Sequence, residues 1–339
     1  MANRTPKEHG GIATSGSGRL GRRSLLALPL LAAPGLARAQ TFPDRPIRIL
    51  VGFTPGGSID IIVRSIAPKM TEVLGQSVLV ENRPGAGGVV AMEALTRSAP
   101  DGYTLKLGTV GSMIVQPILI KDLTYNVQTD IVPVSMTADV TNVLVVHPSR
   151  PWRSVAELVA AAKAKPGEVT WAHSGVGTSG FLSAFLLDRR AGIRTTGVAY
   201  RGAAPMATDL VAGRIDFGFA TSASVIRQVQ EGQLRPLAVS SPGRQPWFPD
   251  VPTMGEAGIA DFQTTNWTGL VAPRGTPRDV IAKLDAACQA ALRDPATVEI
   301  MTRNALVPIV AGPEEFAALW EKDRQRWDPF VRSTGATAN

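Results

Sequence analysis

The 339-residue sequence is 44% hydrophobic and 19% charged, with a formal net charge of +7. A chain of this length and hydropathy can bury one or two cores, which excludes a wholly disordered protein. The positive excess does not indicate nucleic-acid binding, because residues 1–40 hold six Lys and Arg residues against one Glu. The remainder carries 29 positive and 27 negative side chains, so we expect no DNA or RNA partner.

Residues 1–39 have the features of an export signal. A basic, Gly- and Ser-rich start precedes an apolar stretch at residues 25–36, and residues 37–39 (Ala-Arg-Ala) match a small-x-small cleavage site. The apolar stretch is too short to span a bilayer comfortably. The Arg-Arg pair at residues 22–23 indicates a twin-arginine signal, and a general secretory signal is the alternative. We expect the leader to be removed outside the cytoplasm.

The sequence offers little for catalysis or metal binding. Its one cysteine, Cys288, lies in an apolar helical pattern and is expected to be a buried hydrophobic residue. His147 and His173 lie at the ends of expected strands, and we interpret both as structural. The motifs of α/β-hydrolases and zinc proteases are absent. We therefore expect no catalytic residue and no metal, and hence no enzyme.

The first part of the chain alternates short apolar runs, Gly-rich turns and helical patterns. This alternation is typical of βαβ units in an open parallel sheet with helices on both faces. The expected strands are 47–53, 78–81 and 103–109, and the expected helices are 59–74 and 89–97.

A second set of units follows residue 141. Ser154 and Glu157 form a capping box at the start of a helix that Pro166 and Gly167 end. The other expected strands are 142–147, 169–173, 197–200 and 215–220, and helices extend to residues 190 and 212.

The C-terminal part returns to the first domain. We expect a strand at 267–272, then a helix with Thr276 as its cap and Pro277 as its first residue, and mainly helix beyond. The predicted organisation is an α/β protein with one domain of residues 41–141 plus 266–339 and an inserted domain of residues 142–265.

A GxGxxG pattern at 175–180 follows a strand and opens a helix, as a dinucleotide site requires. The acidic residue that should hold the ribose about 20 residues on is absent, because residues 198–201 are Val-Ala-Tyr-Arg. Arg201 suits a 2′-phosphate, but no NADP pool is expected outside the cytoplasm. An exported NADP-dependent oxidoreductase therefore remains the alternative, and we expect no cofactor.

The physics of this loop also suits a carboxylate. Glycines let backbone N–H groups converge, and a following helix N-terminus adds partial positive charge. A second turn of the same kind lies at residues 54–58 (Thr-Pro-Gly-Gly-Ser). The plainer alternative is two ordinary βα turns. Asp60 and Asp209, beside these turns, either complement helix dipoles or accept hydrogen bonds from a ligand amine or hydroxyl.

Six segments together resemble the Bug, or TctC-like, proteins, which are extracytoplasmic solute receptors of tripartite tricarboxylate transporters. The resemblance covers essentially the whole chain beyond the leader. The segments are residues 53–60 (FTPGGSID), 81–88 (ENRPGAGG), 101–105 (DGYTL), 174–179 (SGVGTS), 200–202 (YRG) and 267–270 (WTGL).

The resemblance implies a type II periplasmic-binding-protein fold whose two α/β domains, each a mainly parallel sheet flanked by helices, close on a small carboxylate. It implies a monomer in the periplasm that delivers its ligand to a two-component membrane permease, or alternatively a sensor that docks a signalling protein. The implied ligand-binding residues are Thr54, Pro55, Gly56, Gly57, Ser58, Asp60, Gly111, Ser112, Ser174, Gly175, Val176, Gly177, Thr178, Ser179, Tyr200, Arg201, Gly202 and Asp209.

Two of these expectations stay open at this point. Arg201 is the best candidate for a charged clamp if it faces the cleft, and is otherwise a surface residue. The identity of the ligand is also open, because the family commonly has His-Leu and a later Glu where this chain has Phe181-Leu182 and Ala184-Phe185.

Overall fold

A computed structural model describes residues 42–262, 264 and 266–333 of the protein. These residues belong to one compact unit that begins at Gln40. The predicted export signal lies outside the described residues and stays a prediction. None of the described helices is both long and apolar enough to cross a membrane.

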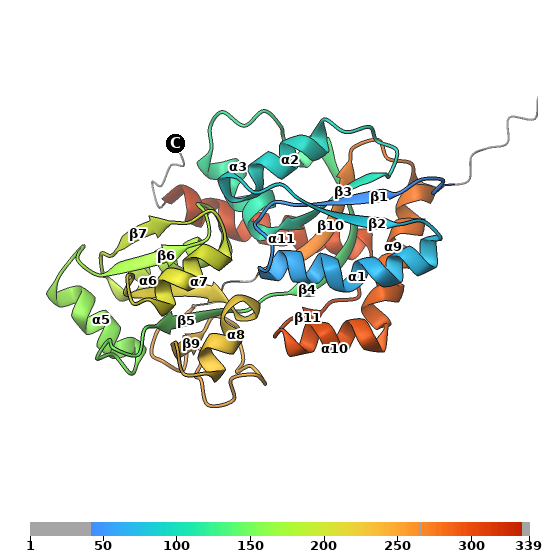
Figure 1. The fold of residues 1–339 in the computed structure, drawn as a ribbon. Helices are drawn as coiled ribbons and strands as arrows, with labels where there is room; N and C mark the ends of the chain where they lie inside the picture. Colours follow the sequence, from blue (N-terminus) through green and yellow to red (C-terminus); the bar gives the residue numbers. More distant parts are fainter. Residues whose placement is uncertain (1–41, 263, 265, 334–339) are drawn as a thin grey trace, which may run out of the picture. The chain divides into compact units, whose positions relative to one another are not determined.

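The first sheet has six strands in the order β11-β4-β10-β3-β1-β2 (Figure 1). Helices α1 and α9 pack against each other on one face, and α2, α3 and α11 pack on the other. The strands are β1 (Ile47–Val51), β2 (Val78–Asn82), β3 (Thr104–Thr109), β4 (Ile131–Asp139), β10 (Trp267–Pro273) and β11 (Val307–Pro308). The helices are α1 (Ser58–Leu74), α2 (Val89–Thr96), α3 (Gln116–Leu119), α4 (Val127–Asp130), α9 (Arg278–Arg293), α10 (Pro295–Arg303) and α11 (Pro313–Ser333).

The second sheet has five strands in the order β7-β6-β8-β5-β9. Its strands are β5 (Asn142–Val146), β6 (Thr170–His173), β7 (Thr196–Ala199), β8 (Phe217–Thr221) and β9 (Arg235–Val239). The accompanying helices are α5 (Val155–Ala164), α6 (Ser179–Ala191), α7 (Ala203–Val211) and α8 (Ser222–Gln230).

The predicted parallel units are present in both sheets, but neither sheet is parallel throughout. Strands β2-β1-β3 and β7-β6-β8 pair in parallel. Strand β10 is antiparallel to β3 and β4, and β5 is antiparallel to β8 and β9. Each of these reversed strands is the first one after the chain passes from one sheet to the other. The alternation of strands and helices in the sequence carries no information on that reversal.

The two crossings lie close to the predicted domain boundaries. Strand β4 ends at Asp139 in the first sheet, and β5 begins at Asn142 in the second. The chain returns to the first sheet at Trp267. Independent movement of the two parts stays a prediction, and we refer to them below as the first lobe (41–141 and 266–339) and the second lobe (142–265).

Local sequence signals explain where two of the helices begin. Ser154 caps α5 by accepting a hydrogen bond from the Glu157 N–H, as predicted, but the Glu157 carboxylate accepts from the N–H of Arg153 rather than of Ser154. The expectation for α9 was wrong by one residue. Pro277 is the cap, because its carbonyl accepts the first helical hydrogen bond. The Thr276 hydroxyl donates instead to the carbonyl of Pro273.

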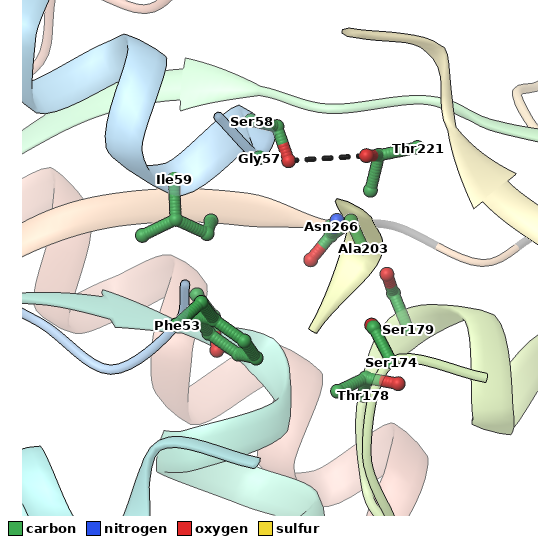
Figure 2. A pocket seen from close by; sticks show the side chains of 11 residues that line it. Phe53, Gly57, Ser58, Ile59, Ser174, Thr178, Ser179, Ala203, Thr221 and Asn266 are labelled. Carbon is green, nitrogen blue, oxygen red and sulfur yellow. Dashed lines mark hydrogen bonds between the residues drawn. The ribbon is translucent and has the colours of Figure 1, made fainter. Parts of the chain in front are cut away.

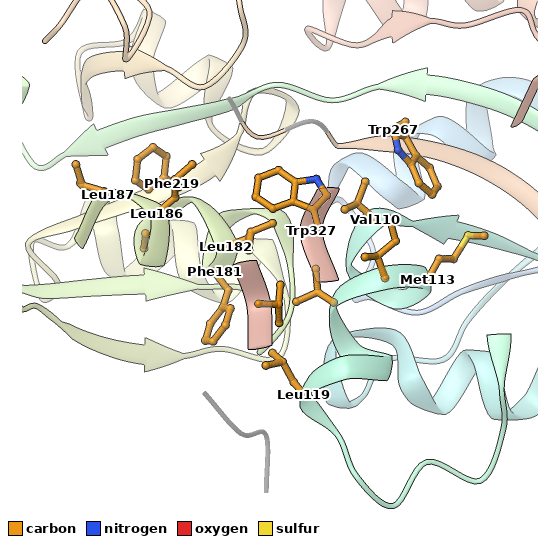
Figure 3. Close-up of a cluster of buried hydrophobic side chains, with 14 of the residues drawn as sticks. Val110, Met113, Leu119, Phe181, Leu182, Leu186, Leu187, Phe219, Trp267 and Trp327 are labelled. Carbon is orange, nitrogen blue, oxygen red and sulfur yellow. The ribbon is translucent and has the colours of Figure 1, made fainter. Parts of the chain in front are cut away.

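A hydrophobic cluster joins residues of both lobes, and we call it the apolar junction (Figure 3). Trp327 on α11, 3% exposed, lies among these side chains. In the view of Figure 3 the first lobe contributes Val110, Met113, Trp267 and Trp327, and the second contributes Phe181, Leu182, Leu186 and Phe219. Because these side chains share one cluster, the two lobes have a common core on this side.

Candidate ligand-binding site

The turn at residues 54–58 joins β1 to α1 and is held in place by Asp60. One carboxylate oxygen of Asp60 accepts hydrogen bonds from the Gly56 N–H and from Arg64 Nε, both at 3.0 Å, and the other accepts from Asn82 Nδ2 at 2.9 Å. Burial would raise the pKa of Asp60, but the hydrogen bonds from Arg64, Gly56 and Asn82 outweigh it and lower the pKa. The carboxylate is thus ionised and engaged by protein groups, and it positions the turn.

The turn at residues 174–179 joins β6 to α6 and is closed by hydroxyl groups. Thr178 caps α6, and its hydroxyl donates to the Gly175 carbonyl at 2.8 Å. The Ser179 hydroxyl donates to Asn142 Oδ1 at 3.2 Å, which ties the helix start to β5. Gly175 and Gly177 have φ of 139° and 79°, so this backbone needs glycine at both positions.

Both turns reach one small cavity of about 40 Å³, between the lobes (Figure 2). The Ser58 hydroxyl donates to Thr221 Oγ1 at 3.1 Å across it. The first residues of four helices line this small cavity, together with Phe53, Thr109, Ser174 and Asn266: Gly57, Ser58 and Ile59 of α1, Thr178 and Ser179 of α6, Ala203 of α7, and Thr221 before α8.

The electrostatics of the small cavity favour an anion. The first N–H groups of a helix have no partner within the helix, and the helix dipole places about half a positive charge at its N-terminus. Four such ends converge here, while no lining side chain is ionisable. The cavity holds about three water molecules at about 10–15 Å³ each, so in this geometry it admits one small polar group.

A larger cavity of about 540 Å³ adjoins the small one and shares Phe53 and Ser174 with it. Gly175 and Val176 of the second turn also line this large cavity, as do Tyr200 and Arg201. Its acidic side chains are Glu93 and Asp122. None of the ion pairs among the described residues includes Arg201. Arg201 is exposed, and its contact with a ligand stays a prediction.

Asp209 lies outside both cavities and orients Tyr200. Its carboxylate accepts a hydrogen bond from the Tyr200 hydroxyl at 2.8 Å and from Arg214 at 2.7 Å. Burial and the neighbouring Asp209 carboxylate raise the pKa of Tyr200 to about 12. Tyr200 is therefore a neutral hydroxyl at the wall of the large cavity.

The lobes touch beside the cavities through glycines and one amide. Gln116, fully buried on α3, donates from Nε2 to the carbonyls of Gly87 at 2.7 Å and Val176 at 3.4 Å. A Cβ added to Gly111 would lie 2.6 Å from the Gly177 carbonyl oxygen. The backbones approach too closely here for any side chain.

The structure thus brings together part of the predicted site. Gly57, Ser58, Ser174, Thr178 and Ser179 line the small cavity, and Ser174, Gly175, Val176, Tyr200 and Arg201 line the large one. The remaining predicted residues line neither of these two cavities, and their contact with a ligand stays a prediction: Thr54, Pro55, Gly56, Asp60, Gly111, Ser112, Gly177, Gly202 and Asp209.

Two of these nine residues lie against the first turn or against a residue of the cavity wall. A Cβ on Gly202 would lie 2.3 Å from Thr54 Oγ1, so this pair sets how closely the first turn approaches α7. Ser112 is fully buried and bonds Thr109.

Sequence reasoning missed Phe53, Ala203, Thr221 and Asn266 as lining residues. Thr221 offered a signal, since a Thr or Ser between a strand and a helix is a common cap. Asn266, next to the WTGL segment, offered none.

Among the described residues, no group of three or more His, Cys, Asp or Glu side chains lies where it could hold a metal. His173 is buried between Trp171 and Phe181, and burial lowers its pKa. Cys288 is buried, as predicted, and burial raises the pKa of its thiol to about 12.

Comparison with known proteins agrees with this arrangement. The sequence profile of the tripartite tricarboxylate transporter family receptor, TctC, matches residues 62–336. BugT of Bordetella pertussis is 38% identical over 307 residues, which cover 90% of this chain and 94% of BugT.

Two solved structures with bound carboxylates are similar over almost their full length. A protein of R. palustris with adipate has a TM-score of 0.84 and 32% identity, covering 87% of this chain and 99% of the other. MatC from Rhodopseudomonas palustris with bound malate has a TM-score of 0.82 and 32% identity, covering 86% and 100%. Other similar structures are a periplasmic transporter and the periplasmic binding protein BugD. The chain belongs to the TctC, or Bug, family of periplasmic solute receptors and has their two-sheet α/β fold.

Proposed function

We propose that the protein captures a small organic carboxylate in the periplasm by closure of its two lobes and passes it, unaltered, to the permease of a tripartite tricarboxylate-type transporter. One carboxylate of the ligand occupies the small cavity, and the rest of the molecule extends into the large cavity. The observation that carries the proposal is the convergence of four helix N-termini on a cavity without ionisable side chains.

The two cavities also suggest the class of ligand. The small cavity has room for a single head group, and Arg201 in the large cavity can pair with a second carboxylate. Dicarboxylates are therefore the preferred class. The adipate and malate bound by the two similar R. palustris proteins fit the same class.

Closure follows from the same contacts. A ligand that bonds the turns at 54–58 and 174–179 together stabilises only the state in which both turns face the small cavity. Ligand binding then shifts the population toward the closed state in proportion to that difference in affinity. No chemical step is part of this cycle.

Thermal unfolding against a panel of acids tests the proposal. The panel contains acetate, malate, adipate, citrate and glutamate, with NADP as the probe for the alternative function. A ligand at 100 times its Kd adds about 2.7 kcal/mol to the unfolding free energy. For a chain of about 300 residues, whose unfolding entropy is about 0.6 kcal/mol/K, this raises the midpoint by about 4 °C. A flat response to every acid together with a rise for NADP would favour an oxidoreductase instead.

The variant Arg201→Gln separates the two cavities. We expect it to weaken binding of malate and adipate by about tenfold or more, because it removes the charged partner of the second carboxylate. Binding of acetate is expected to change little. Arg244→Gln, which removes an exposed guanidinium outside both cavities, is the matched control. An equal loss of affinity for acetate and for adipate would show that Arg201 does not pair with the second carboxylate.

We also propose that residues 1–39 direct export and are removed. N-terminal sequencing of the protein recovered from a periplasmic extract is expected to begin at Gln40. Replacing the Arg-Arg pair at 22–23 with Lys-Lys tests the route, since a twin-arginine signal is sensitive to that change and a general secretory signal is not.

A further inference from the structure

Lys106 is a charged side chain in the interior of the first lobe. It lies on β3, is 1% exposed, and is among the largest fully buried side chains of the protein. Its Nζ donates hydrogen bonds to the Leu107 carbonyl and to Ser112 Oγ, both at 3.1 Å. Both acceptors are neutral.

No described side chain serves as the counter-ion of Lys106. None of the ion pairs among the described residues includes it. Burial alone lowers its pKa to about 7. Three titratable side chains on elements around β3 have partners other than Lys106: Arg48 of β1 bonds Glu81 and Thr104, Glu93 of α2 accepts from Thr124, and Asp323 of α11 accepts from Trp267.

Hydrogen bonds connect Lys106 to the small cavity. Ser112 Oγ, the acceptor for Lys106, also accepts from the Thr109 hydroxyl at 3.3 Å and from the Thr109 N–H at 3.2 Å. Thr109 lines the small cavity. Lys106 Nζ is thus linked through Ser112 Oγ to Thr109, a residue of the cavity wall, in an interior where charges are weakly screened.

A buried ammonium group without a counter-ion is costly, and buried charges in proteins are normally paired. Hydrogen bonds lead from Lys106 through Ser112 to Thr109 in the wall of the small cavity, which the helix N-termini already suit to a carboxylate. We propose that Lys106 is the counter-ion of the bound carboxylate and that it takes up a proton when the ligand binds. The inference rests on the proposed function. It assigns to the small cavity a positively charged side chain, which its lining residues do not provide.

The physical consequence is a binding affinity that depends on pH. Without ligand, Lys106 is partly deprotonated near pH 7. A bound carboxylate favours the charged form and raises the pKa of Lys106. Ligand binding is then accompanied by proton uptake. The Kd rises by up to about tenfold for each pH unit above 7, until the pH passes the pKa of the bound state.

Calorimetry with adipate and malate measures this coupling. The protons that the protein takes up come from the buffer, and phosphate and Tris have different heats of ionisation. The difference between the binding heats in the two buffers at pH 7.5 therefore gives the number of protons taken up per ligand. We expect wild-type protein to take up between about half a proton and one proton per ligand. We expect Lys106→Met to take up none and to bind about tenfold or more weakly at pH 6.5. Lys165→Met removes an exposed lysine of the second lobe and is expected to behave as wild type.

Nuclear magnetic resonance of 13Cε-labelled lysine gives a second measurement that needs no variant. One resonance is expected to titrate near pH 7 without ligand and above pH 8 with it. Proton uptake and Kd in Lys106→Met equal to those of the wild type, or a resonance that the ligand does not move, would overturn the proposal. If neither adipate nor malate binds at any pH, the proposed function for dicarboxylates fails, and the role of Lys106 fails with it.

Discussion

The two lobes meet in two places of opposite character. At the small cavity they meet through the hydrogen bond from Ser58 to Thr221, and beside the cavities they meet through the amide of Gln116 and closely approaching glycines. At the apolar junction they share a core that includes Trp327 and Leu182. A hydrogen bond contributes only about 0.5–1.5 kcal/mol net, whereas a buried aromatic side chain contributes several times more. We therefore expect the polar contacts to open while the apolar junction stays intact, as the proposed closure requires.

Removing the Trp327 side chain tests the apolar junction and has the largest expected effect. We expect Trp327→Ala to lower the unfolding free energy by about 3–5 kcal/mol, because a large buried side chain leaves a cavity. Urea unfolding measures the loss. Trp152→Ala, at a half-buried tryptophan, is the control and should cost clearly less. A loss at Trp327 no larger than that at Trp152 would mean that the junction is not a shared core.

Lys106 is connected to the small cavity through Ser112 and Thr109, and we expect its contribution to stability to depend on pH. The unfolded chain keeps this proton up to about pH 10.4, whereas the folded protein releases it near pH 7. Between these values the unfolded state binds more protons, so the contribution of Lys106 to stability rises with pH. The rise is about 3 kcal/mol between pH 7 and 9.5.

The variant Lys106→Met lacks this titration. The difference in unfolding free energy between wild type and variant, measured in urea at pH 7 and at pH 9.5, should shift in favour of the wild type at the higher pH. At pH 7 the variant should be the more stable protein, because it buries no charge. A difference that is independent of pH would show that Lys106 keeps its proton in the folded state.

The same contrast explains what could be predicted from the sequence. Residues 54–58 and 174–179 were predictable because Gly-rich turns between strand and helix have a local physical signature. The paths of β5 and β10, Thr221 and Asn266 at the cavity, and the burial of Lys106 depend on contacts between distant segments. Asp60 shows the limit most clearly. Its position beside the turn was evident, but its hydrogen bonds to Gly56 and Asn82 were not.

A methyl group at Gly111 tests the polar contact without disturbing either core. The added Cβ would lie 2.6 Å from the Gly177 carbonyl oxygen, so Gly111→Ala obstructs closure. We expect the Kd for a dicarboxylate to rise by about tenfold or more, while the unfolding free energy changes by about 1 kcal/mol or less. Gly243→Ala, where an added Cβ meets no atom within 4 Å, is the matched control. Unchanged affinity in Gly111→Ala would show that binding does not need this approach of the lobes.

Gln116 provides the finest test of the polar contact. The variant Gln116→Leu keeps the side-chain volume but removes the donor to the carbonyls of Gly87 and Val176. It also removes Oε1, which is buried without a partner among the described residues, so the cost in overall stability should be small. In the proposed cycle, the hydrogen bond from Gln116 to the Val176 carbonyl forms only when the lobes close, so the variant destabilises only the closed state. We therefore expect the Kd to rise about fivefold, mainly through faster ligand release. Gln128→Leu, at an exposed glutamine of α4, should leave ligand release unchanged. Slower release in Gln116→Leu would mean that the amide holds the lobes apart rather than together, because its unpaired oxygen would then cost more than its hydrogen bonds contribute.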